Sequence, residues 1–188
     1  MLDPIDWTAL AKQLGLLTET GEQCSWKDVQ RALEILIGER AILASVDDYI
    51  AGAPGTLLAS EVLMLLRPWS AMAYCYDIWK SSRPIDERRE AVRLLRVVAD
   101  HRALGWVGEF LDDRDESIQS WGIGVLDQLL WRDLVLPDEA ESLLIRAEGH
   151  ANPVVREKAE WIRRFIRLQE ARVQWMGKFS ELQLPVSE

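Results

Sequence analysis

A short acidic turn between two runs of helical spacing lies in residues 110–126, FLDDRDESIQSWGIGVL. Beyond the turn, apolar or small residues recur at intervals of three and four: Ile118, Trp121, Gly122, Val125, Leu126 and Leu129. This spacing places them on one face of an amphipathic helix. Asp115 is the expected N-cap, because its carboxylate can accept hydrogen bonds from amide groups of the first turn. Asp112 and Glu116 place negative charge near the positive end of the helix dipole.

The same analysis predicts helices along most of the chain. Asp6 caps a first helix that ends at Gly15, and Ser25 caps a second, with Asp28 completing a capping box before Gly38. Thr56 is the expected cap of a fourth helix, and Pro68 the first residue of a fifth. The other predicted helices are 39–50, 86–100, 103–111, one that starts at 136–138, and 154–179.

The apolar positions also predict which faces are buried. In the second helix these are Val29, Ala32, Leu33 and Leu36. The fourth helix is apolar on most sides, with Leu57, Leu58, Val62, Leu65 and Leu66, and such a helix is expected to be enclosed by its neighbours. The last helix has an inward stripe that consists of Val155, Ala159, Ile162, Ile166, Gln169, Val173 and Met176. Its second apolar stripe consists of Trp161, Phe165, Leu168 and Trp175. We expect this stripe either to be covered by the N-terminal part of the chain or to be a docking surface, including for a second copy of the chain.

No β-hairpin is predicted. Alternating runs are few, and the chain has no Asn-Gly or Asp-Gly pair. The polar segment 18–23, which contains Gly21, is interpreted as a loop between helices. The predicted fold class is therefore all-α.

Three segments can be superimposed on one another: 87–95, 118–126 and 155–162, at offsets of 31 and 37 residues. Each has a small residue at its fifth position, namely Ala91, Gly122 and Ala159, which allows a second helix to approach closely. A period of this length with two helices per unit is typical of an α-solenoid.

These segments resemble HEAT repeats. The family pattern is an acidic or Asn-Pro turn, followed by Val-Arg and then by Ala. Two segments are similar to it: the turn 111–115 with Ile118, and Asn152-Pro153-Val154-Val155-Arg156 with Ala159. The resemblance is clearest over residues 84–168. It implies a right-handed α-solenoid, a HEAT-like stack of antiparallel helix pairs, with Arg156 in a ladder between repeats; Gln119 departs from that pattern.

The domain organisation expected from this resemblance is a single helical domain, residues 1–180. Residues 1–83 form its divergent part and residues 84–180 its HEAT-like part. The tail, residues 181–188, is expected to be loose.

Charge narrows the class of partner. The chain of 188 residues has 22 basic and 31 acidic side chains, a net charge of −9. This balance disfavours nucleic acid, whose phosphates are bound by Lys and Arg. It suits a basic protein surface, or it simply keeps the protein soluble. Residues 154–178 are the exception, with a local charge of +4.

Candidate chemistry is sparse. His101 and His150 are distant in sequence and have no metal-ligand spacing, and they are expected to complement helix C-termini. Cys24 and Cys75 form no CxxC pair, and nucleotide-binding and hydrolase motifs are absent from the sequence. We therefore expect no catalytic residues, metal or cofactor. The chain has no basic leader or long apolar run, so a cytoplasmic protein without membrane spans is expected.

The leading hypothesis is a non-enzymatic protein-binding module, of the immunity or antitoxin type, that neutralises a basic protein. Nine tryptophans favour it, because Trp is an interface anchor as well as a core residue. The candidate partner-binding residues are Glu109, Asp112, Asp113, Asp115, Glu116, Trp106 and Trp121. They would equally fit a capped, solvated turn with buried Trp. The alternatives are an assembly scaffold and, through the resemblance, a HEAT-like DNA glycosylase or bilin lyase.

Overall fold

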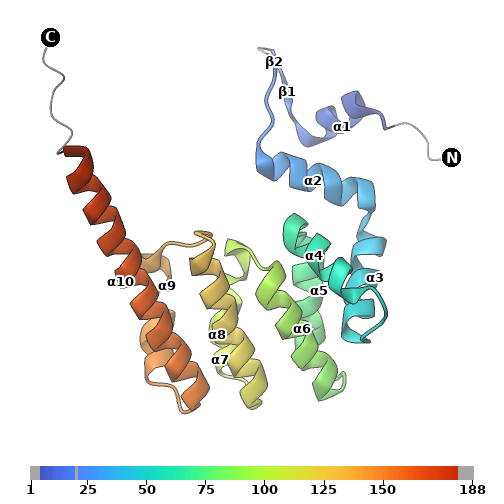
Figure 1. Ribbon diagram of the computed structural model, residues 1–188. Coiled ribbons are helices and arrows are strands. Elements are labelled where there is room, and N and C mark those ends of the chain that lie inside the picture. Colours follow the sequence, from blue (N-terminus) through green and yellow to red (C-terminus); the bar gives the residue numbers. More distant parts are fainter. Residues whose placement is uncertain (1–4, 20, 182–188) are drawn as a thin grey trace, which may run out of the picture. The chain divides into compact units, whose positions relative to one another are not determined.

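The computed structural model describes residues 5–19 and 21–181, and only the backbone at 173, 174 and 176–181 (Figure 1). Within these residues the regular structure is almost entirely helical, as predicted. The helices are α1 (Trp7–Leu14), α2 (Trp26–Ile37), α3 (Glu39–Ile50), α4 (Thr56–Leu66), α5 (Trp69–Lys80), α6 (Ile85–Val98), the 3₁₀ turn η1 (His101–Ala103), α7 (Leu104–Leu111), α8 (Glu116–Trp131), α9 (Pro137–Glu148) and α10 (Pro153–Glu181). The predictions for Val173, Met176 and the tail beyond Glu181 lie outside the described side chains and residues.

The prediction that no hairpin occurs was wrong. Strand β1 (Leu17–Thr18) pairs antiparallel with β2 (Gly21–Glu22), in the register Leu17 with Glu22 and Thr18 with Gly21. Gly21 has a φ of 125°, a conformation that glycine adopts without strain. With two residues per strand, the pairing is too short for an alternating pattern to appear in the sequence.

Local caps agree with the sequence. The Asp6 side chain accepts from the amide of Ala9, and Ser25 and Asp28 form a complete capping box. Gly15 ends α1 at a φ of 73°. Two predicted starts were displaced by one residue: Gly55 is the N-cap of α4, with Thr56 already helical, and Pro68 is the N-cap of α5. Shifts of this size are ordinary at helix ends.

The chain packs as two compact units, one up to Asp100 and one from His101. In the first unit α5 packs most extensively against α6, and α3 contacts α4, α5 and α6. The predicted inward residues of α6 are all buried: Ala91, Leu94, Leu95 and Val98. They meet buried residues of α5, which are Ala71, Met72, Cys75, Ile78 and Trp79.

Two predicted buried faces in this unit were wrong. None of the α2 residues is buried, and Leu36 is exposed. On α4, Leu57 and Leu58 are 76% and 71% exposed, and Val62 and Leu65 are also exposed. The helix contacts α2, α3 and α6 along one side, where Leu63 and Leu66 are buried. Its composition predicted neighbours on every side, but composition does not determine how many helices pack around it.

In the second unit, α7 packs on α8 and α9 packs on α10. The two pairs also touch through α8 with α10 and α7 with α9. Phe110, Ile118, Leu126, Leu144 and Ile162 belong to the shared core. Gly122 lies directly against Phe110, as expected for a small residue at a close helix approach, and Ala159 is fully buried.

Among the described residues, no helix is both long enough and apolar enough to cross a membrane. The all-helical class is confirmed apart from the hairpin. The solenoid arrangement, the HEAT resemblance and the single-domain organisation stay predictions.

Candidate functional site

The acidic turn between α7 and α8 uses its carboxylates to hold its own backbone. Asp115 accepts from the amides of Ser117 and Ile118 at 3.0 and 3.1 Å, so it caps α8 as predicted. Asp113 accepts from the amide of Asp115 at 2.9 Å. Asp112 forms an ion pair with Arg146 of α9. Each of these predicted partner-binding residues therefore has a structural contact within the unit.

The other predicted site residues belong to the helices on either side of this turn. Glu116 is exposed, and its carbonyl accepts from Ser120 and from Asn152. Trp106 and Glu109 on α7 and Trp121 on α8 are half-buried. Their role in binding a partner stays a prediction.

A second turn, between α9 and α10, is tied to the first by hydrogen bonds. Asn152 donates to the side chain of Gln119 at 2.9 Å and to the carbonyl of Glu116 at 3.2 Å. His150 Nε2 lies 2.9 Å from the carbonyl oxygen of Leu111, while its Nδ1 accepts from the amide of Asn152 at 3.0 Å. His150 therefore has a structural role, in the turn that follows α9.

Gln119 and Arg156 make equivalent contacts in their two turns. Gln119 donates to the carbonyl of Asp113 at 2.7 Å, six residues earlier in the chain. Arg156 donates to the carbonyl of His150 at 2.6 Å, also six residues earlier. Arg156 thus bonds carbonyl groups of its own turn, while Asn152 and His150 connect the two turns.

An aromatic cluster joins the end of α8 to α10. Trp131 lies 6.2 Å from Trp161 and 4.9 Å from Phe165 between ring centroids, and the rings of Trp161 and Phe165 are parallel at 5.9 Å. Lys158 lies 5.0 Å above the Trp161 ring and 3.3 Å from the buried Asp127. Trp131 and Trp161 are 55% and 42% exposed, so a large aromatic surface faces solvent.

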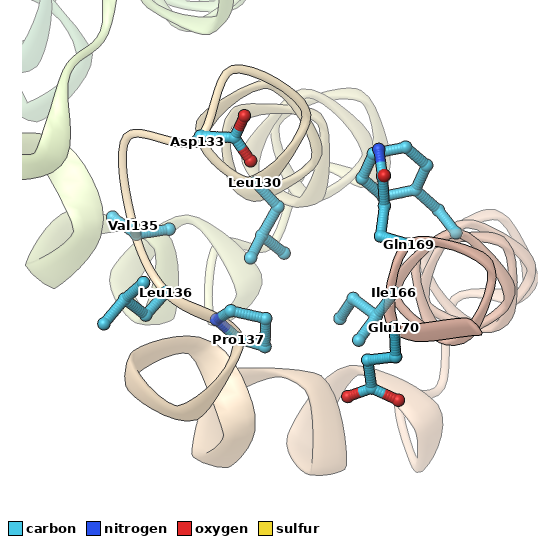
Figure 2. A pocket seen from close by; sticks show the side chains of 9 residues that line it. Leu130, Asp133, Val135, Leu136, Pro137, Ile166, Gln169 and Glu170 are labelled. Atoms are coloured by element: carbon cyan, nitrogen blue, oxygen red, sulfur yellow. The ribbon is translucent and has the colours of Figure 1, made fainter. Parts of the chain in front are cut away.

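A groove adjoins this cluster, and we call it the α8–α10 groove (Figure 2). It has a volume of about 380 Å³. Its apolar lining comes from the end of α8, the α8–α9 connection, the first residue of α9 and α10: Leu130, Val135, Leu136, Pro137, Phe165 and Ile166. Leu130, Pro137 and Ile166 face one another across it in Figure 2. Its volume falls within the range of binding sites that enclose one or more bulky groups.

The polar groups at this groove are mainly acidic. Asp133 and Glu170 lie on opposite sides of it, and Gln169 is the third polar residue of the lining. Both carboxylates belong to exposed residues, and neither has an ion-pair partner in the described part of the chain. Asp133 has a φ of 52°, a left-handed conformation that Asp tolerates better than most residues.

Three basic side chains of α10, Lys158, Arg163 and Arg164, have carboxylate partners within the unit. Arg163 bonds Glu141 at 2.5 and 2.9 Å and Glu148 at 2.7 Å. These hydrogen bonds raise the pKa of Arg163, and its bond lowers the pKa of Glu141. Arg164 lies 3.6 Å from Glu160. Nearby carboxylates therefore neutralise part of the local charge of +4.

In the first unit, Tyr74, Asp47 and Arg83 form a polar cluster that links α5, α3 and the α5–α6 connection. Tyr74 donates to Asp47 at 3.0 Å and accepts from Arg83 at 2.9 Å. Partial burial and the Asp47 carboxylate raise the pKa of Tyr74. The side chains of Asp47 and Arg83 are exposed, and the contacts are those of a surface link between helices.

Within the part of the chain that the structure describes, no group of three or more His, Cys, Asp or Glu side chains could hold a metal ion. The α8–α10 groove was missed from the sequence, because its lining comes from three elements. One signal was available: the connection Asp133-Leu134-Val135-Leu136-Pro137 is apolar, whereas connections between helices are usually polar. Comparison with family models, curated proteins and solved structures gives no match to this chain.

Proposed function

We propose that this protein is a protein-binding module of the immunity or antitoxin type, without enzymatic activity, that neutralises a basic protein partner by covering part of its surface. The observation that carries the proposal is the exposed aromatic cluster of Trp131, Trp161 and Phe165 beside the α8–α10 groove. Exposed Trp next to a concave apolar surface is characteristic of interface hot spots.

A HEAT-like stack of helix pairs is part of the same proposal. It is supported in the second unit by the contacts of α7 with α9 and of α8 with α10. It is also supported by two links between consecutive pairs, Asn152 with Gln119 and Arg146 with Asp112. Stacked pairs of this kind offer extended surfaces on which helix ends and turns from several units can contact one partner.

The net charge of −9 supports a basic partner. Complementary charge increases the rate of association and disfavours acidic competitors more than it adds to affinity. Glu116 is the residue of the acidic turn best placed for this effect, since its exposed carboxylate is not required to cap α8. Asp112, Asp113 and Asp115 contribute charge while they hold the turn.

The decisive experiment asks whether a gene next to the one that encodes this chain specifies a basic, toxin-like protein, and it uses that gene product. The full chain is co-expressed with that product, and growth and stoichiometric complex formation are measured. We expect protection from toxicity and a one-to-one complex whose association slows as salt is raised. A chain that neither protects nor binds would overturn the proposal.

A charge variant then tests the acidic turn separately. Glu116→Lys is expected to slow association severalfold with a smaller effect on dissociation, because an exposed interfacial charge acts mainly on encounter. Glu22→Lys, an exposed carboxylate of β2 in the other unit, is the matched control. Equal association rates for both variants would remove the acidic turn from the binding site and leave the module itself in place.

An assembly scaffold is the second candidate function. Trp161, Leu168 and Trp175 recur every seven residues on α10, with Phe165 between the first two, and this heptad spacing is typical of helix–helix association. Leu168 and Trp175 are exposed. Sedimentation equilibrium tests this function. A dimer that Leu168→Glu converts to a monomer would support the scaffold function, and a protein that is monomeric at all concentrations would contradict it. The glycosylase and lyase alternatives have no comparable observation in their favour.

A further inference from the structure

We propose that the α8–α10 groove binds an amphipathic helical segment of the partner that carries Lys or Arg beside a bulky apolar anchor. This inference rests on the proposed function and specifies the surface and the chemistry of its partner. The groove is the place where an apolar depression, an aromatic surface and unpaired carboxylates coincide among the described residues.

The shape of the groove fits side chains presented by a helix. Its volume of about 380 Å³ accommodates one or two bulky apolar side chains. Leu136 is 67% exposed at its edge, and Phe165 continues into the aromatic cluster, so the apolar surface extends beyond the depression itself. A helix that places apolar residues at i, i+3 or i+4, and i+7 matches an elongated surface of this kind.

The charges specify the sign of the occupant. Asp133 and Glu170 lie on opposite sides of the apolar lining, so a segment in the groove has a carboxylate on either side of it. A cationic side chain next to the apolar anchor is attracted by both, and an acidic one is repelled by both. Arg or Lys also keeps its apolar stem against the groove while its charge reaches the rim.

Two exposed apolar faces of the chain itself, on α4 and α10, fit this occupant poorly. Helix α4 has an exposed apolar face, but its single charged residue is Glu61, which has the same sign as the rim. In α10, Trp161 and Phe165 already pack on Trp131, and Arg163 and Arg164 already face carboxylates of their own chain. We assign the complementary helix to the partner of the proposed function, and occupation of the groove by a second copy of this chain is an outcome of the test below.

The test uses the full chain and two synthetic amphipathic helices of about five turns. Both probes have the same Leu and Trp face, and their polar faces are all Lys in one and all Glu in the other. Binding is followed by the anisotropy of a fluorophore on the peptide. We expect saturable binding of the Lys probe at least tenfold tighter than that of the Glu probe, with the difference shrinking as salt screens the rim.

Two pairs of variants locate the binding. Leu136→Ser is expected to weaken binding of the Lys probe about tenfold, the effect of losing one apolar anchor. Ile145→Ser is expected to leave the affinity for this probe unchanged. Ile145 is the matched control, because it is 59% exposed on α9 and does not line the groove. Asp133→Asn with Glu170→Gln is expected to cost roughly fivefold, the size of two exposed charge pairs. Glu157→Gln, on α10 outside the groove, is its control.

The outcomes separate this inference from the proposed function. Equal affinity for both probes, or equal effects of Leu136→Ser and Ile145→Ser, overturns the groove proposal. Self-association that blocks the Lys probe overturns it too, because the groove is then occupied by a second copy. If the Leu136→Ser chain still neutralises its partner with unchanged affinity, the inference fails while the proposed function stands.

Discussion

Gly122 of α8 lies directly against Phe110 of α7. A Cβ atom at position 122 would be 2.5 Å from the Cβ of Phe110 and 3.4 Å from its Cγ. Carbon atoms in a packed interior are normally separated by about 3.5–4.0 Å. The absence of a side chain at position 122 therefore determines how closely α7 and α8 approach each other.

Gly122→Ala is expected to destabilise the protein by about 1–3 kcal/mol, the usual cost of overpacking a core. The clash outweighs the gain of up to about 1 kcal/mol that Ala brings to a helix interior. Gly105→Ala on α7 is the control, because no atom lies within 4 Å of its added Cβ. Urea unfolding measures both variants. A Gly122→Ala protein as stable as Gly105→Ala would show that α7 and α8 separate without cost.

Asn152→Asp is expected to lower the free energy of unfolding by about 1–3 kcal/mol, the cost of leaving buried acceptors unsatisfied. Asp keeps the acceptor that receives the amide of Val154, but it loses the donors to Gln119 and to the Glu116 carbonyl. Asp115→Asn is the control, since both residues cap helices well. Chemical denaturation of the double variant Asn152→Asp/Gln119→Ala measures the energetic coupling between these two side chains. If the two substitutions lower the free energy of unfolding additively, a direct link between the side chains is contradicted.

The ion pair between Glu141 and Arg163 predicts acid sensitivity. The bond to Arg163 lowers the pKa of Glu141 below its ordinary 4.5, so its stabilising contribution is present above the unfolded-state pKa. That contribution is lost as pH falls through the lower folded-state value. The midpoint of thermal unfolding should fall less on acidification in Glu141→Gln than in the wild type. Parallel curves for the two proteins between neutral pH and about pH 3 would contradict this.

The two cysteines are expected to differ strongly in reactivity. Cys24 is exposed, whereas Cys75 is fully buried in α5 and burial raises the pKa of its thiol. Because the thiolate is the reactive form, a disulfide reagent should modify Cys24 rapidly. It should modify Cys75 only when the unit that contains α5 opens. Cys24→Ser should remove the fast phase alone. Two equal fast phases would show that α5 is not enclosed as described.

Features set by neighbouring residues could be predicted from the sequence. Asp6, Ser25 and Asp115 cap helices because a short polar side chain reaches amides two or three residues ahead. The buried face of α6 was also predicted, since both strong apolar periodicity and a charged opposite face are present there. The fifth-position Gly122 was identified correctly as a site of close helix approach.

Features set by tertiary packing could not be predicted. The sequence of α4 is apolar enough to be enclosed, yet Leu57 and Leu58 are exposed because its neighbouring helices pack along its other side. The α8–α10 groove requires Leu130, Pro137 and Ile166 to converge from three elements. The acidic turn was identified from its charge, but its carboxylates also have local partners that a composition argument does not reveal.

Gln119 and Arg156 hold two turns by the same hydrogen bond to a carbonyl six residues earlier, one with a neutral side chain and one with a cation. A neutral amide and a cation at such a position give the surface different electrostatic potentials, although only the amide of Gln119 can also accept from Asn152. Successive turns of this chain can therefore diverge in charge, and so in the partners they attract, without the helices having to be rearranged.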